Sequence, residues 1–332
     1  MPSLIDPSLQ DEFLREGFVT LRLLTGAQAS ACREAVAAVH GKADWVPNHA
    51  ETANYLSELD DSGEMKIRLG EALSAMLEPE IERHFRDFRV LMHTLFVKPA
   101  PGNPTTMHQH VPISDAPFDQ NLVIWCALSD CEVDTGALYV IPRSHHLYRY
   151  IRTYEAPDFF DSYRDKLIAR HARRLTFKAG EAVVMDHSLL HGAFANSGPL
   201  PRLASASVLL SPDAQHMIYR RADMHTVAMK PLSRAGEDGE GLKAGLQHWE
   251  GTTHGQFPAW WNDATFAQTE ALLAAAGPRA SMTHDPLETV AHLGRRERTS
   301  GGARAIVRRI PGASRAARLL RRVAAKARGD AR

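Results

Sequence analysis

The sequence lacks the features that mark an exported or membrane-embedded protein. It contains only three cysteines among 332 residues, Cys32, Cys126 and Cys131, which form neither an even set nor a CxxC pair. A disulfide framework is therefore not expected, and a reducing compartment is favoured. The sequence contains no apolar run of about 18 residues, and residues 1–20 have no basic segment followed by an apolar one. These absences predict a cytoplasmic protein.

The chain also lacks net charge, because 39 basic residues balance 39 acidic ones, but the two signs are separated along the sequence. Residues 295–332 hold 13 lysines and arginines and only two acidic residues, a net charge of +11. The remaining residues, 1–294, therefore carry a net charge of −11. No second block of distinct composition interrupts residues 1–290, so this part is predicted to be a single domain followed by a separate basic tail.

The tail has the pattern of a basic amphipathic helix. Ser314 is a candidate N-cap after Pro311-Gly312, and apolar residues then recur at helical spacing among arginines. Such a segment is either a solvated chain or a helix that docks through 303–332 onto an anionic membrane surface or an acidic protein partner. The second possibility would place the protein peripherally at a membrane. No aromatic or motif feature indicates nucleic-acid binding.

The pattern of apolar residues predicts a β-rich domain with helices before the strands. Many short strands with no helices between them favour an antiparallel sandwich or barrel over a doubly wound sheet. The stretch 147–172, rich in aromatic and charged residues, is predicted to be an insertion that forms a lid or a substrate wall. Residues 216–262 are expected to complete a pocket or form a dimer contact. The predicted helices are 8–16, 26–40 and 64–86, and the predicted strands are 90–98, 105–110, 121–128, 137–141, 174–177, 182–186 and 203–210.

The clearest chemical signal is the segment MHQH at 107–110, together with HG at 191–192. On a strand, His108 and His110 would point to the same face and grip one metal ion, and His191 would complete the set. Three imidazoles with open coordination positions are typical of a catalytic rather than a structural metal site. An isolated HxH in a chain with 17 histidines is more often an ordinary surface or core pair, so the signal depends on the neighbouring motifs.

Those motifs resemble the phytanoyl-CoA dioxygenase family of non-haem Fe(II), 2-oxoglutarate-dependent oxygenases over roughly residues 9–215. The similar blocks are EFLREGFVTLRLLTGAQASACREAV at 12–36, NLVIWCALSDCEVDTGALYVIPRSHH at 121–146 and FKAGEAVVMDHSLLHGAFANSGPLPRLA at 177–204. The resemblance implies a double-stranded β-helix (jelly-roll, cupin-like) core with flanking helices. It also implies Fe(II) as cofactor and 2-oxoglutarate as co-substrate, with hydroxylation as the default reaction.

The same resemblance assigns roles to individual residues. His108 matches the first metal-binding histidine and His191 the distal one. Arg202, eleven residues after His191, matches the arginine that binds the far carboxylate of 2-oxoglutarate, and Lys98 and Thr105 are candidates to assist it. Taken alone, Arg202 would be an ordinary surface cation and Lys98 an exposed strand end.

One position departs from the family pattern, because His110 stands where the His-x-Asp motif has its aspartate. In one interpretation, His110 is itself a ligand and the site is a three-histidine triad with one more positive charge. In another, a carboxylate moves in, with Asp115 and Asp186 nearest in sequence. In a third, metal affinity is lost and the chain is a non-catalytic binding protein.

A further alternative is a three-histidine metal enzyme that does not use 2-oxoglutarate, whose turnover would not depend on Arg202. The substrate is expected to be a small molecule or an acyl or carrier-bound metabolite, and the sequence does not distinguish between them. Asn121 and Trp125 are candidate pocket residues. His84, His93, His145, His146, His187 and His225 are interpreted as structural.

Overall fold

The computed structural model describes most of the region before the basic tail. The chain divides into two units, and every described residue belongs to the first, Met1–Ala291. The predicted tail at 295–332 and His225 lie outside the described residues. The described ranges are 1–41, 45–49, 54–115, 121–147, 153, 160–221, 226–231, 255–258 and 266–275.

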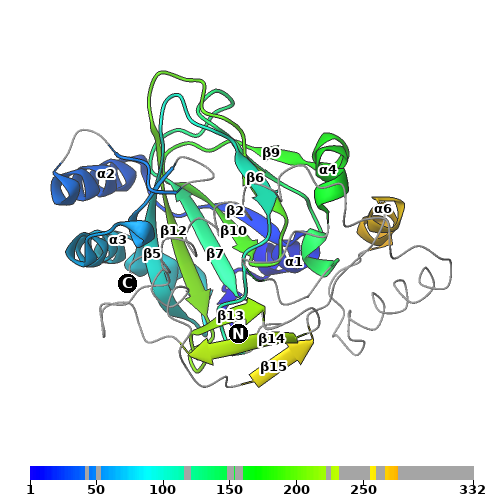
Figure 1. The fold of residues 1–332 in the computed structure, drawn as a ribbon. Coiled ribbons are helices and arrows are strands. Elements are labelled where there is room, and N and C mark those ends of the chain that lie inside the picture. The colour runs from blue at the N-terminus through cyan, green and yellow to red at the C-terminus, as the bar shows by residue number, and fades with distance from the viewer. Residues whose placement is uncertain are drawn as a thin grey trace, which may run out of the picture. The chain divides into compact units, whose positions relative to one another are not determined.

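The larger of two facing sheets has six antiparallel strands in the order β2-β10-β7-β12-β5-β3 (Figure 1). Strand β12 lies between β7 and β5, and its register places Arg202 opposite Lys98 and Ala206 opposite Thr94. Because side chains alternate along a strand, these four residues share one face of the sheet. The strands are β2 (Phe18–Arg22), β3 (Tyr55–Leu56), β5 (Arg89–Lys98), β7 (Leu122–Ala127), β10 (Glu181–Asp186) and β12 (Arg202–Leu210).

A four-stranded sheet, in the order β6-β11-β8-β9, packs against that face. Its strands are β6 (Thr105–His108), β8 (Leu138–Val140), β9 (Arg173–Leu175) and β11 (His191–Ala193). One buried apolar cluster joins the inner faces of the two sheets, and it includes Trp125, Ala206, Val140 and Ala193. Two facing antiparallel sheets of this kind form a jelly roll, so the predicted mainly β, double-stranded β-helix core is confirmed.

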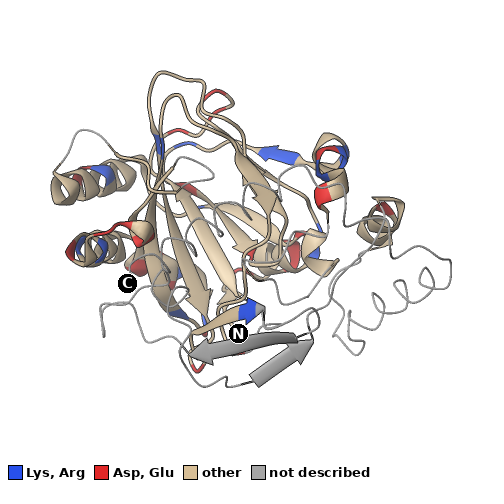
Figure 2. Ribbon diagram, viewed as in Figure 1, with Lys and Arg blue, Asp and Glu red and all other residues tan. Residues whose placement is uncertain are grey.

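Three helices cover the opposite face of the six-stranded sheet. Leu73 and Leu77 of α3 belong to the same buried cluster as Leu95 and Ile124 of the sheet. Figure 2 shows that charged residues are concentrated on the helices and loops, whereas the central strands are largely uncharged. The helices are α1 (Pro7–Glu16), α2 (Gly26–His40) and α3 (Gly63–His84), close to the predicted ranges.

Side-chain caps explain where the first two helices begin. Asp6 accepts hydrogen bonds from the backbone N–H groups of Ser8 and Leu9 at the start of α1. Thr25 and Gln28 form a reciprocal capping box at the start of α2, which satisfies backbone donors that a helix N-terminus leaves without partners.

The described part of the predicted insertion packs on the outer face of the smaller sheet. It contains α4 (Arg164–His171), whose buried Leu167 shares a cluster with Met107 and Tyr139 of the sheet and with Leu273 of α6 (Phe266–Ala275). Residues 148–152 and 154–159 lie outside the described residues, so only part of the lid or substrate wall predicted at 147–172 is described. The described helix α4 serves as a cover for the sheet.

The region after β12 contributes a small three-stranded sheet. Its strands are β13 (Met217–Arg221), β14 (Thr226–Pro231) and β15 (Gly255–Pro258). The Tyr219 hydroxyl donates to the carbonyl oxygen of Ser114 at 2.6 Å, which ties β13 to the loop that follows the metal motif. A two-stranded sheet pairs β1 (Ser3–Leu4) with β4 (Phe85–Arg86). No helix in the described ranges is long and apolar enough to cross a membrane.

Candidate active site

Three histidines converge on the inner side of the smaller sheet. His108 ends β6 and lies opposite His191, the first residue of β11, and His110 follows two residues after β6. One potential ligand nitrogen from each ring lies within 4.8 Å of the others. Among the histidine, cysteine and acidic residues in the described part of the chain, these three histidines are the group that is arranged to hold a metal ion.

The structure differs from the prediction in the extent of the strand. Strand β6 ends at His108, two residues before the predicted end, so His110 lies just beyond it. The backbone N–H of His110 donates to the carbonyl oxygen of His187 at 3.0 Å, in the turn between β10 and β11. The rings of His110 and His191 then lie 4.6 Å apart between centroids. This tertiary hydrogen bond helps to hold His110 beside His191.

Backbone contacts fix the orientation of the other two rings. The Nδ1 atom of His108 lies 2.8 Å from the carbonyl oxygen of Thr106, and Nδ1 of His191 lies 2.9 Å from that of Leu189. A carbonyl oxygen only accepts, so each Nδ1 must carry the proton and each Nε2 presents its lone pair. This tautomer is the one that a metal-binding histidine adopts when its second nitrogen donates to the backbone.

The turn after β10 supplies neighbours that sequence reasoning had left as structural. The buried His187 ring packs against His110 with centroids 5.0 Å apart. Burial lowers the pKa of His187 to about 4, so its ring is neutral at physiological pH. The side chain of Gln109 donates to the carbonyl oxygen of Ser188 in the same turn. In the sequence, only the four-residue spacing from His187 to His191 indicated that His187 lies near the histidine cluster.

Neither candidate carboxylate joins the cluster. Asp186 is buried, and its Oδ1 accepts from the backbone N–H and hydroxyl of Ser188. Asp115 accepts from the backbone N–H of Gln215 at 2.9 Å. Asp186 thus stabilises the turn after β10, whereas Asp115 joins two segments that are distant in sequence, and the described histidine cluster contains no acidic member.

A pair of buried cations lies on the facing sheet. Lys98 is 0% exposed and Arg202 is 3% exposed, and the two are register partners on β5 and β12. Burial lowers the pKa of Arg202, and burial together with the nearby Arg202 lowers the pKa of Lys98 to about 7. In the described part of the chain, no acidic side chain forms an ion pair with either cation, and Nε of Arg202 has no hydrogen-bond partner.

The surroundings of Arg202 hold its planar head in place. One terminal nitrogen donates to the carbonyl oxygen of Gly136, and the guanidinium lies 5.1 Å from the ring centroid of Trp125. Trp125, predicted as a pocket residue, therefore contacts the predicted co-substrate arginine. Thr105 begins β6, with Ala193 as its register partner, so it belongs to the histidine-bearing sheet.

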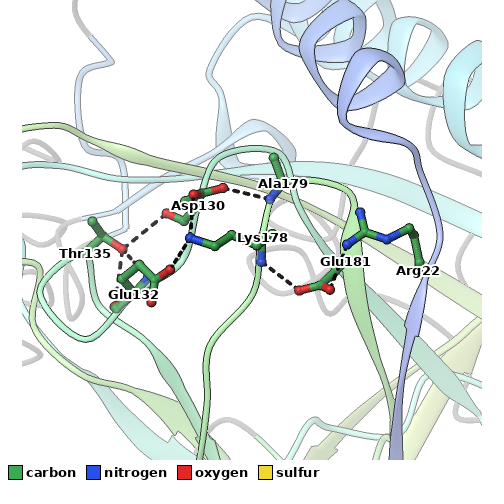
Figure 3. Close-up of polar contacts among 7 residues, drawn as sticks. All are labelled: Arg22, Asp130, Glu132, Thr135, Lys178, Ala179 and Glu181. Carbon is green, nitrogen blue, oxygen red and sulfur yellow. Dashed lines mark hydrogen bonds and ion pairs between the residues drawn. The ribbon is translucent and has the colours of Figure 1, made fainter.

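An ionic clamp outside the pocket braces the loop that carries Gly136 (Figure 3). The ammonium of Lys178 contacts Asp130 at 3.0 Å and Glu132 at 2.7 Å, and the backbone N–H of Ala179 donates to Asp130. These hydrogen bonds, from Ala179 first and then Lys178, lower the pKa of the Asp130 carboxyl. Because the clamp is exposed, we assign it a role in loop geometry rather than a large share of stability.

Two other histidines have contacts of a structural kind. His93 lies on the helix-facing side of β5, where Nδ1 is 2.8 Å from the Ser207 hydroxyl and Nε2 is 3.1 Å from Glu78. Nε2 of His145 lies 3.2 Å from the carbonyl oxygen of Leu14, at the end of α1. Both residues join secondary-structure elements away from the metal-type cluster.

Comparison with known proteins yields one family match. The model of the phytanoyl-CoA dioxygenase (PhyH) family matches residues 24–204, which is more than half of the chain. The matched span contains His108, His110 and His191, as well as Lys98 and Arg202. No match was found among the curated proteins.

Several solved structures are similar in fold at low sequence identity. The α-ketoglutarate-dependent carbocyclase SnoK from nogalamycin biosynthesis is 20% identical, with 64% of this chain and 86% of that chain covered and a TM-score of 0.48. EctD from S. alaskensis with 2-oxoglutarate and 5-hydroxyectoine is also 20% identical, with 64% of this chain and 78% of that chain covered and a TM-score of 0.46. EvdO2 from Micromonospora carbonacea var. aurantiaca, complexed with 2-oxoglutarate, is 22% identical, with 70% of this chain and 98% of that chain covered and a TM-score of 0.43. Similarity at this level does not indicate the substrate of this chain.

Proposed function

Because the chain belongs to the phytanoyl-CoA dioxygenase family and is therefore a 2-oxoglutarate-dependent Fe(II) oxygenase, we propose that His108, His110 and His191 are its iron ligands. The observation that carries this proposal is the convergence of their ligand nitrogens within 4.8 Å. Imidazole is a suitable ligand for iron, and three ligands on one side leave positions open for a co-substrate and oxygen.

The chemistry of the donors supports this assignment. His108 and His191 present Nε2 because each Nδ1 donates to a carbonyl oxygen. The buried neighbour His187 remains neutral, so it adds no positive charge beside the ion. When bound, Fe(II) would activate dioxygen, the oxidant, and would couple the oxidative decarboxylation of 2-oxoglutarate to succinate with oxidation of the substrate.

A three-histidine site lacks the negative charge that an aspartate would bring to Fe(II). The two negative charges of 2-oxoglutarate offset the additional positive charge of such a centre, and the buried cations Lys98 and Arg202 provide a place for its far carboxylate. In this proposal Arg202 binds that carboxylate through the nitrogen that has no partner in the described residues, and Lys98 adds a second charge. Trp125 and the Gly136 carbonyl keep the guanidinium in one orientation. Thr105 is a lesser candidate to assist from the opposite sheet.

The substrate in this proposal is a small molecule or an acyl or carrier-bound metabolite, and hydroxylation is the reaction. The wall that faces the histidines supports a largely apolar substrate, because the inner face of the large sheet carries Phe96, Trp125, Ala206 and Val208. Exclusion of water by such a wall protects the reactive centre during turnover.

Succinate release from 2-oxoglutarate in air tests the function. We expect Fe(II)-dependent release by the wild-type protein and at least a tenfold loss in His108→Ala and in His191→Ala. His84→Ala serves as the matched control, because His84 ends α3 away from the cluster. Equal release by the wild type and the two ligand variants would contradict the proposal, and so would release that does not require iron.

A further inference from the structure

The inner face of β5 carries an acidic group beyond the two cations. Leu95 and Val97 belong to the cluster under the helices, so the alternate residues Thr94, Phe96 and Lys98 face the smaller sheet. The hydroxyl of Thr94 donates to Oε2 of Glu58 at 2.9 Å. Glu58 therefore reaches the inner face from the 3₁₀ turn Ser57–Leu59, which follows the edge strand β3.

A second contact fixes this turn against β5. The backbone N–H of Leu95 donates to the Ser57 hydroxyl at 2.9 Å. Ser57 and Thr94 are both buried, whereas Glu58 retains partial exposure. The carboxyl of Glu58 is thus held by the Thr94 hydroxyl, while the residue as a whole remains partly exposed.

The position of Glu58 differs from that of the co-substrate cations. Thr94 is four residues from Lys98 on the same strand, about 13 Å along the sheet at the usual rise per residue. Phe96 lies between them on β5, and Val208 lies on β12 just beyond Ala206, the register partner of Thr94; both are partly exposed although they pack against the buried inner cluster. The wall therefore runs from a cationic end, through an apolar stretch with residual exposure, to a carboxyl.

From this arrangement we infer that Glu58, held by Thr94, is a specificity-determining residue that accepts a hydrogen bond from an amine or hydroxyl group on an otherwise apolar substrate. The inference rests on the proposed function. The apolar part of the substrate packs on Phe96 and Val208, and the Glu58 carboxylate repels a substrate that carries an anionic group in place of the amine or hydroxyl.

The electrostatics of Glu58 agree with a role in recognising a donor. Burial raises the pKa of the Glu58 carboxyl, while the hydrogen bond from Thr94 and the nearby Lys66 lower it. A carboxyl that is poorly solvated gains from a donor on the ligand, because a hydrogen bond to a charged group is stronger than one between neutral groups.

The test uses three probes of equal chain length: octylamine, octanol and octanoate. Their dissociation constants are measured without oxygen on the protein loaded with Fe(II) and 2-oxoglutarate. We expect octylamine and octanol to bind the wild type at least about tenfold more tightly than octanoate. The preference should disappear in Glu58→Gln and shift toward octanoate in Glu58→Lys. Glu64→Gln is the matched control, because Glu64 lies exposed in the first turn of α3.

Binding of Fe(II) and 2-oxoglutarate separates a failure of the proposed function from a failure of the role of Glu58. Iron and 2-oxoglutarate should bind Glu58→Gln as they bind the wild type, and a wild type that binds neither would instead refute the proposed function. Three results would overturn the role of Glu58: an amine preference that survives in Glu58→Gln, equal or tighter binding of octanoate by the wild type, or failure of all three probes to bind the loaded protein. Thr94→Val, which removes the hydroxyl with little change in shape, should reduce the preference partially.

Discussion

His108 and His191 are register partners on neighbouring strands, and their ring centroids lie 4.4 Å apart. The backbone N–H of His110, just beyond β6, donates to His187 in the turn after β10, and this bond holds His110 at the same place. The pairing of β6 with β11 thus assembles the histidine cluster, in which His110 stands where the family motif has its aspartate.

Replacing His110 separates the three interpretations of the altered motif. His110→Ala should weaken Fe(II) binding by at least tenfold, because the site then retains only two ligands. His110→Asp should retain binding, with the spectrum of a site with two histidines and one carboxylate. Anaerobic Fe(II) titration measures both variants. Unchanged affinity in His110→Ala would show that the histidine is not a ligand.

Replacing Arg202 separates co-substrate binding from metal binding. Arg202→Ala should raise the KM for 2-oxoglutarate by about tenfold to a hundredfold, because a charge-assisted fork to the far carboxylate is lost. Fe(II) affinity should stay the same. Arg202→Lys should recover only part of the loss, since an ammonium cannot form two parallel hydrogen bonds. A wild-type KM in Arg202→Ala would favour a metal enzyme that does not use 2-oxoglutarate.

Lys98 should make co-substrate binding depend on pH. Its pKa of about 7 reflects burial and the nearby Arg202, with a smaller opposing effect from Cys131. A bound dianion favours the charged lysine, so above pH 7 binding must be accompanied by proton uptake. The Kd for 2-oxoglutarate, measured on the iron-loaded protein, should rise by up to about tenfold per pH unit above 7. Lys98→Met should bind more weakly at pH 7 and lose this slope.

The ligand-free protein should show the opposite trend in stability. Between about pH 7 and pH 10 the unfolded chain keeps the proton on Lys98 while the folded chain loses it. The contribution of Lys98 to the free energy of unfolding therefore increases as the pH rises through this window. Urea unfolding of the wild type and of Lys98→Met would measure the difference. A pH dependence that is identical in the two proteins would contradict the shifted pKa.

The extent to which the site was predictable differs from residue to residue. The periodicity of apolar residues predicted α1 and α2 closely, because this signal is local. Strand β11 was not among the strands predicted from the apolar pattern, because the sequence His-Gly-Ala shows no alternation of large apolar and polar residues. The placement of His110 and the contact with His187 depend on a hydrogen bond between distant segments. Such a bond cannot be predicted from the residues that surround either histidine in the sequence.

Glu58 illustrates the same limit. It lies in a short 3₁₀ turn with no motif around it, and only the pairing of β3 with β5 brings it to the inner face. The adjacency of Lys98 and Arg202 likewise follows from the register of β5 with β12. The family resemblance suggested both cations, whereas their burial and the lowered pKa of Lys98 follow from the three-dimensional structure.

A glycine in the turn before β10 should be intolerant of a side chain. Gly180 has a φ of +90°, and a Cβ there would lie 2.2 Å from the carbonyl oxygen of Leu24. Gly180→Ala should lower the free energy of unfolding by about 1–3 kcal/mol or more, measured by urea denaturation. Gly26→Ala is the matched control, because a Cβ there meets nothing within 4 Å and should be tolerated. Equal stability of the two variants would refute the prediction.

The most direct test of the three-histidine centre is an anaerobic titration of the wild-type protein with Fe(II) and then with 2-oxoglutarate. Coordination of the co-substrate by iron gives a weak visible charge-transfer band. We predict that the band appears at one equivalent of iron, is lost in His110→Ala, and requires much more 2-oxoglutarate in Arg202→Ala. Iron binding without the band would contradict co-substrate chelation at this centre, and a failure to bind iron would contradict the centre itself.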